Sequence, residues 1–484
     1  MKPQPACWRW VAVAAILLPV GSCAVDAVAP ARYVRFAEVR PVLTELAGAL
    51  PPELAGLTEA QLEAQWPDWI ARHDRDVRAR LEQGDEDTIV NWLLFGTSFT
   101  AQPRAVMGAV EANAADQQAT LRRTVELISA RLDDLITALA APGTDERRLF
   151  ARRFLEQQGF RFETAAGQQA ARDQLLGAIM RVAREQEQID QELGATSGGD
   201  SLVEFVQRSR LFRTRGLSLD TTWLPNYAIE QSLAAMKAQG LVKAGQMRRV
   251  AIVGPGLDFA DKDVGFDFYP QQTLQPFAVL DSLRRLDLVP ASGDHEIVLF
   301  DISPRVIDHV TTARTRAAKA EGYTVRLPLT RTTEWLPEVR KYWEVFGDQI
   351  GAPAEGAVPK AISDQAELRA VRATPAAVER ISVADLNIVT ERLDMGGGEA
   401  GQAFDLVIAT NVFIYYDVLE QALALANVEA MLKPGAFLLA NFAAPQVRTL
   451  TIRPIDTHTT VYGRAQNGAE NVLDFLVWYR ARAN

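Results

Sequence analysis

The stretch RRVAIVGPGLDF, which begins at Arg249, restricts the possible folds of this chain more than any other. Residues 250–253 form a short apolar run rich in β-branched side chains, as expected for a buried strand. Gly254-Pro255-Gly256 follows at once, and glycine lets the backbone turn tightly beside a ligand. Because ligands bind at the carboxyl ends of strands in open α/β sheets, we predict a ligand-binding turn directly after a buried strand.

Strands and helices alternate around this turn. Further strands are predicted at residues 297–300, 381–384, 404–411 and 436–440, and helices at residues 227–239, 271–286, 305–321 and 419–432. Residues 333–375 are interpreted as an irregular insertion over the sheet, and Lys433-Pro434-Gly435 as a turn. The end of the chain predicts two antiparallel strands around Asn467-Gly468. This order predicts an α/β fold with a Rossmann-like, mostly parallel sheet and a C-terminal antiparallel hairpin.

The preceding residues, 31–215, have a helical period. Two apolar stripes recur at three- and four-residue spacing: Leu121, Val125, Ile128, Leu132, Leu135 and Leu139, then Leu175, Leu176, Ile179, Val182, Ile189 and Leu193. We interpret both as helix-bundle core rather than as a coiled-coil surface, because neither persists for many heptads. Single cores stop growing at roughly 250–300 residues. The sequence therefore predicts an all-α domain, residues 31–215, before the Rossmann-like domain, residues 217–484.

Residues 1–23 have the layout of a targeting signal, with Lys2 and Arg9 before an apolar run and Gly21-Ser22-Cys23 after it. The end of this segment resembles a bacterial lipoprotein signal, which implies that Cys23 is lipidated and that the protein is anchored to a membrane of the cell envelope. The alternatives are an ordinary export signal peptide, or no signal at all and a cytoplasmic protein.

Several classes of function are disfavoured by the composition. A formal net charge of -10 argues against a nucleic-acid partner, which would select a basic surface. The two cysteines, Cys7 and Cys23, both precede the predicted domains, and the four histidines are far apart, so no zinc-ligand spacing is present. Neither a phosphate-binding G-x-x-x-x-G-K-[ST] loop nor a G-x-S-x-G nucleophile elbow occurs.

Three features at predicted strand ends point to a nucleoside ligand. The turn at Gly254 and Gly256 allows close backbone approach, Asp301 can accept hydrogen bonds from ribose hydroxyls, and Asp385 can accept one from an adenine amino group. The alternatives are structural: a tight turn at the glycines, a helix cap at Asp301 and a turn residue at Asp385.

Longer motifs contain these residues: VAIVGPG, EIVLFDIS, ADLN, and FDLVIATNVFIYYD followed by MLKPGAFLLAN. On them, residues 217–484 resemble the class I S-adenosylmethionine-dependent methyltransferases, and the last pair resembles a signature of the chemotaxis-receptor glutamate methyltransferases. The resemblance implies S-adenosylmethionine as cofactor and a small molecule or protein as methyl acceptor. It implies that the cofactor is bound by Gly254, Pro255, Gly256, Asp301, Ile302, Asp385, Leu386 and Asn411, with Tyr415 near the methyl-transfer centre as the catalytic candidate.

If the acceptor needs a general base, Tyr415, Tyr416 and Asp417 are candidates, although Asp417 also suits the N-cap of the following helix. Asn411 and Tyr415 could instead only hold their loop together.

Two positions depart from the family pattern. Ile252 stands where an acid commonly precedes the first glycine, and Asp258 where a third glycine commonly lies. The polar and aromatic loop 257–270 is interpreted as a binding loop, with oxygen ligation of a metal as a minor alternative and no metal site predicted. Two hypotheses follow: a methyltransferase whose helical domain recognises the substrate, or a non-catalytic envelope lipoprotein that uses the same fold as a binding or scaffold module.

Overall fold

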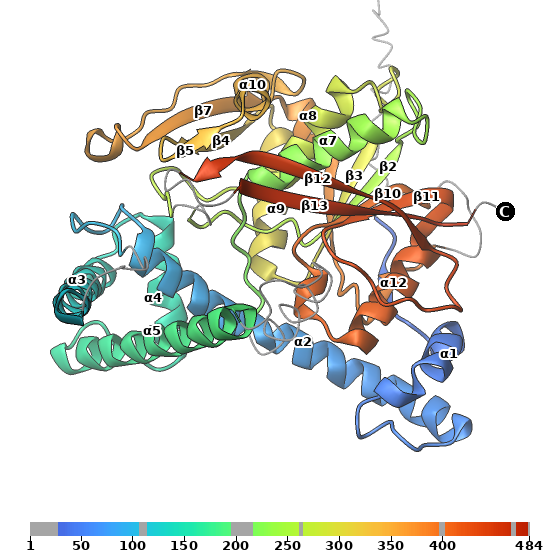
Figure 1. Ribbon diagram of the computed structural model, residues 1–484, viewed down its shortest axis with the longest axis horizontal. Helices are drawn as coiled ribbons and strands as arrows, with labels where there is room; N and C mark the ends of the chain where they lie inside the picture. The colour runs from blue at the N-terminus through green and yellow to red at the C-terminus, as the bar shows by residue number, and fades with distance from the viewer. Residues whose placement is uncertain are drawn as a thin grey trace, which may run out of the picture.

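A central eight-stranded sheet organises the protein (Figure 1). The computed structural model describes residues 28–105, 114–194, 216–260, 265–395, 402–465 and 471–482. Across the sheet the strand order is β5-β12-β13-β11-β10-β2-β3-β8. In that order, the strands comprise Thr333–Trp335, Arg453–Ala465, Asn471–Arg480, Leu432–Ala440, Phe404–Ala409, Arg249–Val253, Glu296–Asp301 and Ile381–Asp385.

The five strands β8-β3-β2-β10-β11 are parallel, whereas β13 pairs antiparallel with both β11 and β12. Taken in chain order, the parallel strands lie as 3-2-1-4-5, which is the doubly wound order. The direction of winding therefore reverses between β2 and β10. The predicted α/β fold with a mostly parallel, Rossmann-like sheet and a closing hairpin is present; the turn at Asn467-Gly468 lies outside the described residues.

Each face of the sheet belongs to a different hydrophobic core, because side chains alternate along a strand. Val250 and Ile252 of β2 pack with helices α7, Leu224–Ala238, α8, Gln275–Arg285, and α9, Pro304–Ala317. Ala251 and Val253 pack on the opposite face with α12, Val418–Met431, and with α1, Phe36–Glu45, and α2, Glu59–Phe95. The N-terminal helices α1 and α2 are thus part of the core that covers one face of the sheet.

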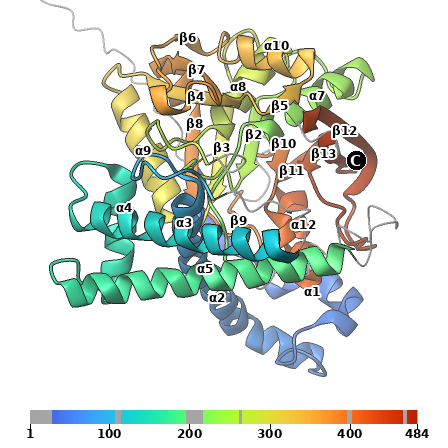
Figure 2. The same cartoon turned by 60° about the vertical axis from the view of Figure 1, so that its left-hand side comes forward.

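The remaining N-terminal helices, α3, Ala114–Ala140, α4, Glu146–Gln157, and α5, Ala165–Gly194, form a third core with the end of α2 (Figure 2). Leu132, Leu135 and Leu139 are fully buried in it, as the stripe predicted. Leu121 and Val125 are 65% and 58% exposed, so the first half of that stripe is not core. Residues 31–33 are also not helical: strand β1, Ala31–Tyr33, pairs antiparallel with β9, Glu391–Leu393.

The prediction of an irregular segment at 333–375 is wrong. It contains β5 at the edge of the main sheet, helix α10, Pro337–Val345, and strands β6, Gly351–Pro353, and β7, Ala366–Ala373, and helix α11, Pro375–Glu379, begins at its last residue. Strand β7 pairs with β6 and with β4, Tyr323–Thr330, in a separate three-stranded sheet. β4 and β7 pair with each other across helix α10 and several loops, and local composition does not reveal such pairing.

The turn predicted before the strand β11 is also placed differently. Lys433-Pro434-Gly435 lies inside β11 rather than before it, where the pairing with β10 shifts register, and Gly435 has a φ of 79°. Cys23 and the rest of the predicted signal lie outside the described residues. Among the residues that are described, no helix combines the length and the apolar character needed to cross a membrane.

Candidate functional site

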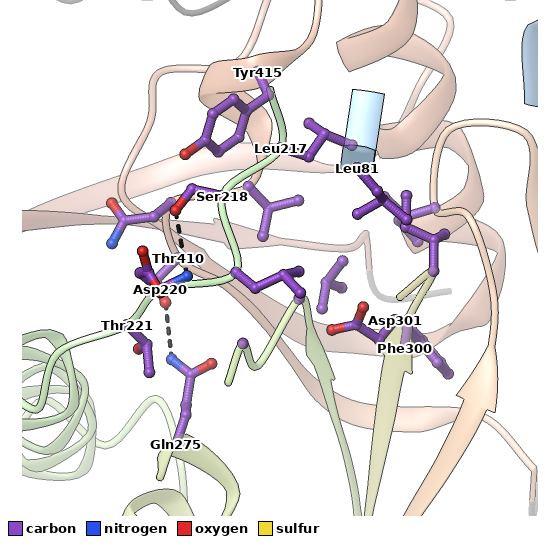
Figure 3. A pocket seen from close by; sticks show the side chains of 18 of the residues that line it. Leu81, Leu217, Ser218, Asp220, Thr221, Gln275, Phe300, Asp301, Thr410 and Tyr415 are labelled. Atoms are coloured by element: carbon purple, nitrogen blue, oxygen red, sulfur yellow. Dashed lines mark hydrogen bonds between the residues drawn. The ribbon is translucent and has the colours of Figure 1, made fainter. Parts of the chain in front are cut away.

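The main pocket lies at the carboxyl ends of β2, β3 and β10, where the winding of the sheet reverses (Figure 3). Its volume is about 900 Å³, including the part open to solvent. Ligand sites of doubly wound sheets lie at this reversal, and ligand pockets typically measure about 300–1,000 Å³. Seven of the residues predicted from sequence line it: Gly254, Gly256, Asp301, Ile302, Leu386, Asn411 and Tyr415.

The glycine turn needs both of its glycines. Gly254 and Gly256 have φ of 60° and 72°, a left-handed region that residues with a side chain rarely adopt. A Cβ on Gly254 would lie 2.7 Å from Val412 Cγ2, and one on Gly256 would lie 2.6 Å from the carbonyl oxygen of Leu219. That same carbonyl accepts a 2.9 Å hydrogen bond from the Leu257 backbone N–H. The segment containing Leu219 therefore packs directly on the turn and forms one wall of the pocket.

Asp301 ends β3 with its carboxylate facing the pocket (Figure 3). Its Oδ1 accepts a 2.8 Å hydrogen bond from the Ser303 backbone N–H. Its Oδ2 is buried and has no hydrogen-bond partner among the residues that the structure describes. Burial raises the pKa of Asp301 to about 7, against the lowering effect of the backbone N–H groups of Ser303 and Ile302. A buried carboxylate oxygen without a partner is costly, and a ligand hydroxyl would satisfy it.

Asp385 and Pro255 do not line the pocket. Asp385 is next to Asp301 in the register of β8 and β3, but its side chain is 59% exposed and its Oδ1 accepts a 2.7 Å bond from Arg78 Nη1 of α2. The neighbouring Leu386 takes the place at the pocket wall. Asp385 therefore forms an ion pair with helix α2. The sequence of β8 alone does not indicate this contact.

Asn411 has the left-handed φ of 59°, unusual for a residue with a side chain. Its backbone N–H donates to Asn441 Oδ1 at 2.7 Å, and Asn441 Nδ2 donates to Asn411 Oδ1 at 2.5 Å. These two hydrogen bonds stabilise the strained backbone just after the carboxyl end of β10.

Tyr415 follows in a short 3₁₀ turn, Phe413–Tyr415, and its side chain lines the pocket. Its carbonyl oxygen accepts a 3.0 Å bond from Arg80 of α2. Burial raises the pKa of Tyr416 above its usual value, which keeps that phenol protonated at neutral pH. Asp417 caps α12 by accepting the Glu420 backbone N–H at 2.9 Å, as predicted. Tyr415 and Tyr416 are therefore the two candidates whose side chains are buried in the pocket wall without a capping role.

Two parts of the pocket were missed from sequence. Leu81 of α2 and the segment 217–222 both line it, and Figure 3 shows Leu81, Leu217, Ser218 and Thr221 around the strand ends. Gln275 of α8 also reaches the pocket, where its Nε2 donates to Thr410 Oγ1 at 2.9 Å. No local signal marks these residues, because each is brought to the site by packing between distant segments.

In the described part of the loop 257–270, Asp258 and Asp267 are hydrogen-bonded to other residues of the protein. Asp258 forms an isolated bridge with Gln272, whose Nε2 donates to Asp258 Oδ2 at 3.0 Å. Asp267 accepts bonds from Trp92 and from the backbone N–H groups of Thr97 and Ser98. Burial alone would raise the pKa of Asp267. Hydrogen bonds from Thr97 and Ser98 act in the opposite direction, and the pKa is lowered overall. Within the described ranges no group of three or more histidine, cysteine, aspartate or glutamate side chains could hold a metal ion.

No protein-family model matches the sequence, and no curated protein matches it either. Among solved structures, the N-methyltransferase NodS from Bradyrhizobium japonicum WM9 aligns with 54% of this chain and 97% of its own at 12% identity, with a TM-score of 0.25. The magnesium protoporphyrin IX methyltransferase ChlM from Synechocystis PCC 6803, solved with bound SAM, aligns with 62% and 90% at 12% identity and a TM-score of 0.24. Cofactor-bound Rv0187 from MTB aligns with 61% and 97% at 13% identity and a TM-score of 0.24. Similarity at this level carries no assignment of function, which has to come from the chain's own residues.

Proposed function

We propose that the protein binds S-adenosylmethionine in the main pocket and transfers its methyl group to an acceptor. The observation that carries the proposal is the unsatisfied Asp301 Oδ2, which lies at the end of β3 inside a pocket at the reversal of a doubly wound sheet. A ribose diol supplies the donors that such an oxygen requires. The sequence resemblance to class I methyltransferases selects S-adenosylmethionine among nucleoside ligands.

The residues present fit this cofactor in chemistry. Asp301 would accept the ribose hydroxyls, and the apolar side chains of Phe300, Leu386 and Ile388 would border the base. The polar groups Ser218, Thr221 and Gln275, on the wall beside Gly256, would meet the amino-acid end. This division gives each chemical part of the cofactor a matching part of the pocket.

When bound, the cofactor supplies an electrophilic sulfonium methyl. The protein's contribution is to position the cofactor and the acceptor and to exclude water from the pocket. Leu81 and Leu217 close the pocket on the side of α2, and Tyr415 stands where we assign the methyl-transfer end. Because Asp417 caps a helix, a base for an acceptor that starts protonated is assigned to Tyr415, to Tyr416 or to the acceptor's own environment.

The direct test is calorimetric titration of the full-length protein with S-adenosylmethionine and S-adenosylhomocysteine. Asp301→Ala should weaken binding by about 10- to 150-fold, the range for one hydrogen bond to a charged group. Asp385→Ala is the matched control, because this acid ends the neighbouring strand but does not line the pocket. Absence of heat at millimolar ligand, or equal losses in the two variants, would reject the assignment. The non-catalytic binding module would then be the better hypothesis.

A further inference from the structure

A second, larger cavity lies between α4, α9 and β4, on the part of the molecule where Figure 2 shows α4 and α9 together. Its volume is about 1560 Å³, including the part open to solvent. It shares no lining residue with the main pocket. Four arginines line it from three different elements: Arg153 of α4, Arg305 and Arg316 of α9, and Arg326 of β4. We call this cavity the basic cleft.

The positive charge of the basic cleft is only partly compensated. Arg305 is paired with Asp85 of α2 at 2.6 Å. Within the described part of the chain, Arg153, Arg316 and Arg326 each lack a carboxylate within 4.0 Å. Two acids, Glu146 and Asp308, also line the cleft, against its four arginines. In a protein with a net charge of -10, this cleft thus has an excess of arginines over acids, and three of its arginines have no ion pair among the described residues.

The inner wall of the basic cleft is rigid and neutral. The Thr273 backbone N–H donates to the Tyr323 hydroxyl at 2.9 Å, and that hydroxyl lies 2.7 Å from His309 Nε2. Either the phenol or the imidazole supplies the proton of this second hydrogen bond, depending on the histidine tautomer. Burial, and then the charges of Arg316 and Arg305, lower the pKa of His309 to about 4. The wall therefore adds no cation of its own but experiences the positive field of the arginines.

The rest of the lining combines apolar and aromatic residues with the polar side chains of Gln271, Thr312 and Thr324. Leu257 and Ala313 are buried at the cleft, and the Arg305 guanidinium lies 3.6 Å from the centre of the Phe150 ring. Stacking of this kind fixes the plane of a guanidinium. Arg305 also donates hydrogen bonds to Asp85 and to Gln271 Oε1. A ligand that fits has an anionic head for the arginines and an organic body for the aromatic wall.

We propose that the basic cleft binds a phosphate group, either as free phosphate or as a phosphate monoester of a small organic molecule. Guanidinium forks match the spacing of phosphate oxygens, and a dianion compensates more than one of the three arginines. The inference is independent of the proposed methyltransferase activity, because the two cavities have no lining residue in common.

Calorimetric titration of the full-length protein with phenyl phosphate and, separately, with inorganic phosphate tests the proposal at constant low ionic strength. Both probes are expected to bind. Tighter binding of phenyl phosphate assigns an organic monoester, because the aromatic wall then contributes, and equal binding assigns free phosphate. Arg326→Gln and Arg316→Gln are each expected to weaken binding at least about 10-fold, the lower end for a charge-assisted hydrogen bond.

The matched control is Arg314→Gln, which removes the same charge from α9 but does not line the cleft. It should leave phosphate binding within about twofold, as expected for a screened surface charge. Circular dichroism and S-adenosylmethionine titration of each variant separate loss of the phosphate site from loss of the fold or of the main pocket. Absence of heat with both probes, or an equal loss in Arg314→Gln, would overturn the proposal.

Discussion

Asp301→Asn is expected to stabilise the ligand-free protein at alkaline pH while it weakens cofactor binding. Burial raises the pKa of Asp301 to about 7, from an ordinary value near 4. A carboxyl group with a raised pKa binds protons more tightly in the folded than in the unfolded state, so stability falls as pH rises through this window. Stability falls by about 1.4 kcal/mol for each pH unit between the unfolded and the folded pKa, so the loss between pH 5 and pH 8 is about 3 kcal/mol, nearly all of it below pH 7. The amide that replaces the carboxyl group in the variant carries no charge and does not incur this loss.

The assay is urea unfolding of both proteins at pH 5 and pH 8, followed by tryptophan fluorescence. The assay compares the unfolding free energy of variant and wild type at each pH. From pH 5 to pH 8 the variant should gain up to about 3 kcal/mol of stability relative to the wild type. Asp385→Asn is the control, since that carboxylate is mostly exposed and paired with Arg78. A difference independent of pH, or an equal shift in the control, would refute the reasoning that the unsatisfied Asp301 is maintained at a cost in stability for the sake of a ligand.

Two further substitutions test the walls of the main pocket. Gly256→Ala should abolish S-adenosylmethionine binding in calorimetry, because its Cβ would displace the Leu219 carbonyl. Gly240 has a similar φ but open space around it, so the control Gly240→Ala should lose only about 1–2 kcal/mol of stability and keep binding. Arg78→Ala should lower the free energy of urea unfolding by about 2 kcal/mol, because it leaves the buried Asp74 and the half-buried Glu391 without their cationic partner. The same change at the exposed Arg75 should stay within about 0.5 kcal/mol.

The parts of the fold that were predictable are those specified by short-range pattern. An apolar run followed by Gly254 and Gly256 identifies β2 and its turn, and the acid at the end of the next run identifies β3 and Asp301. The parallel strands predicted from such runs all exist within a few residues of their expected bounds. The three-stranded sheet of β4, β6 and β7 was not predictable in this way, because β4 and β7 pair with each other across helix α10 and several loops.

The candidate site was predictable only where strand ends build it. Asp301, Asn411 and the glycines belong to the strands that define the reversal of the sheet, and they meet in the pocket. Asp385 has the same position on its strand, yet Arg78 holds its side chain outside the pocket. Whether an acid at a strand end faces a ligand or an arginine depends on what covers the sheet, and that depends on contacts hundreds of residues apart in sequence.

The covering element is α2, which makes the N-terminal helices part of the site. Within one turn of α2, Arg78 binds Asp385, Arg80 binds the Tyr415 carbonyl and Leu81 enters the pocket. One turn later Asp85 pairs with Arg305, a residue that also lines the basic cleft. A single rigid helix therefore contacts the wall of the main pocket and a cation of the cleft. Because α1 and α2 also bury Trp66, Trp69 and Val77 in the core beneath one sheet face, removing the N-terminal helices would expose that face and open the pocket together.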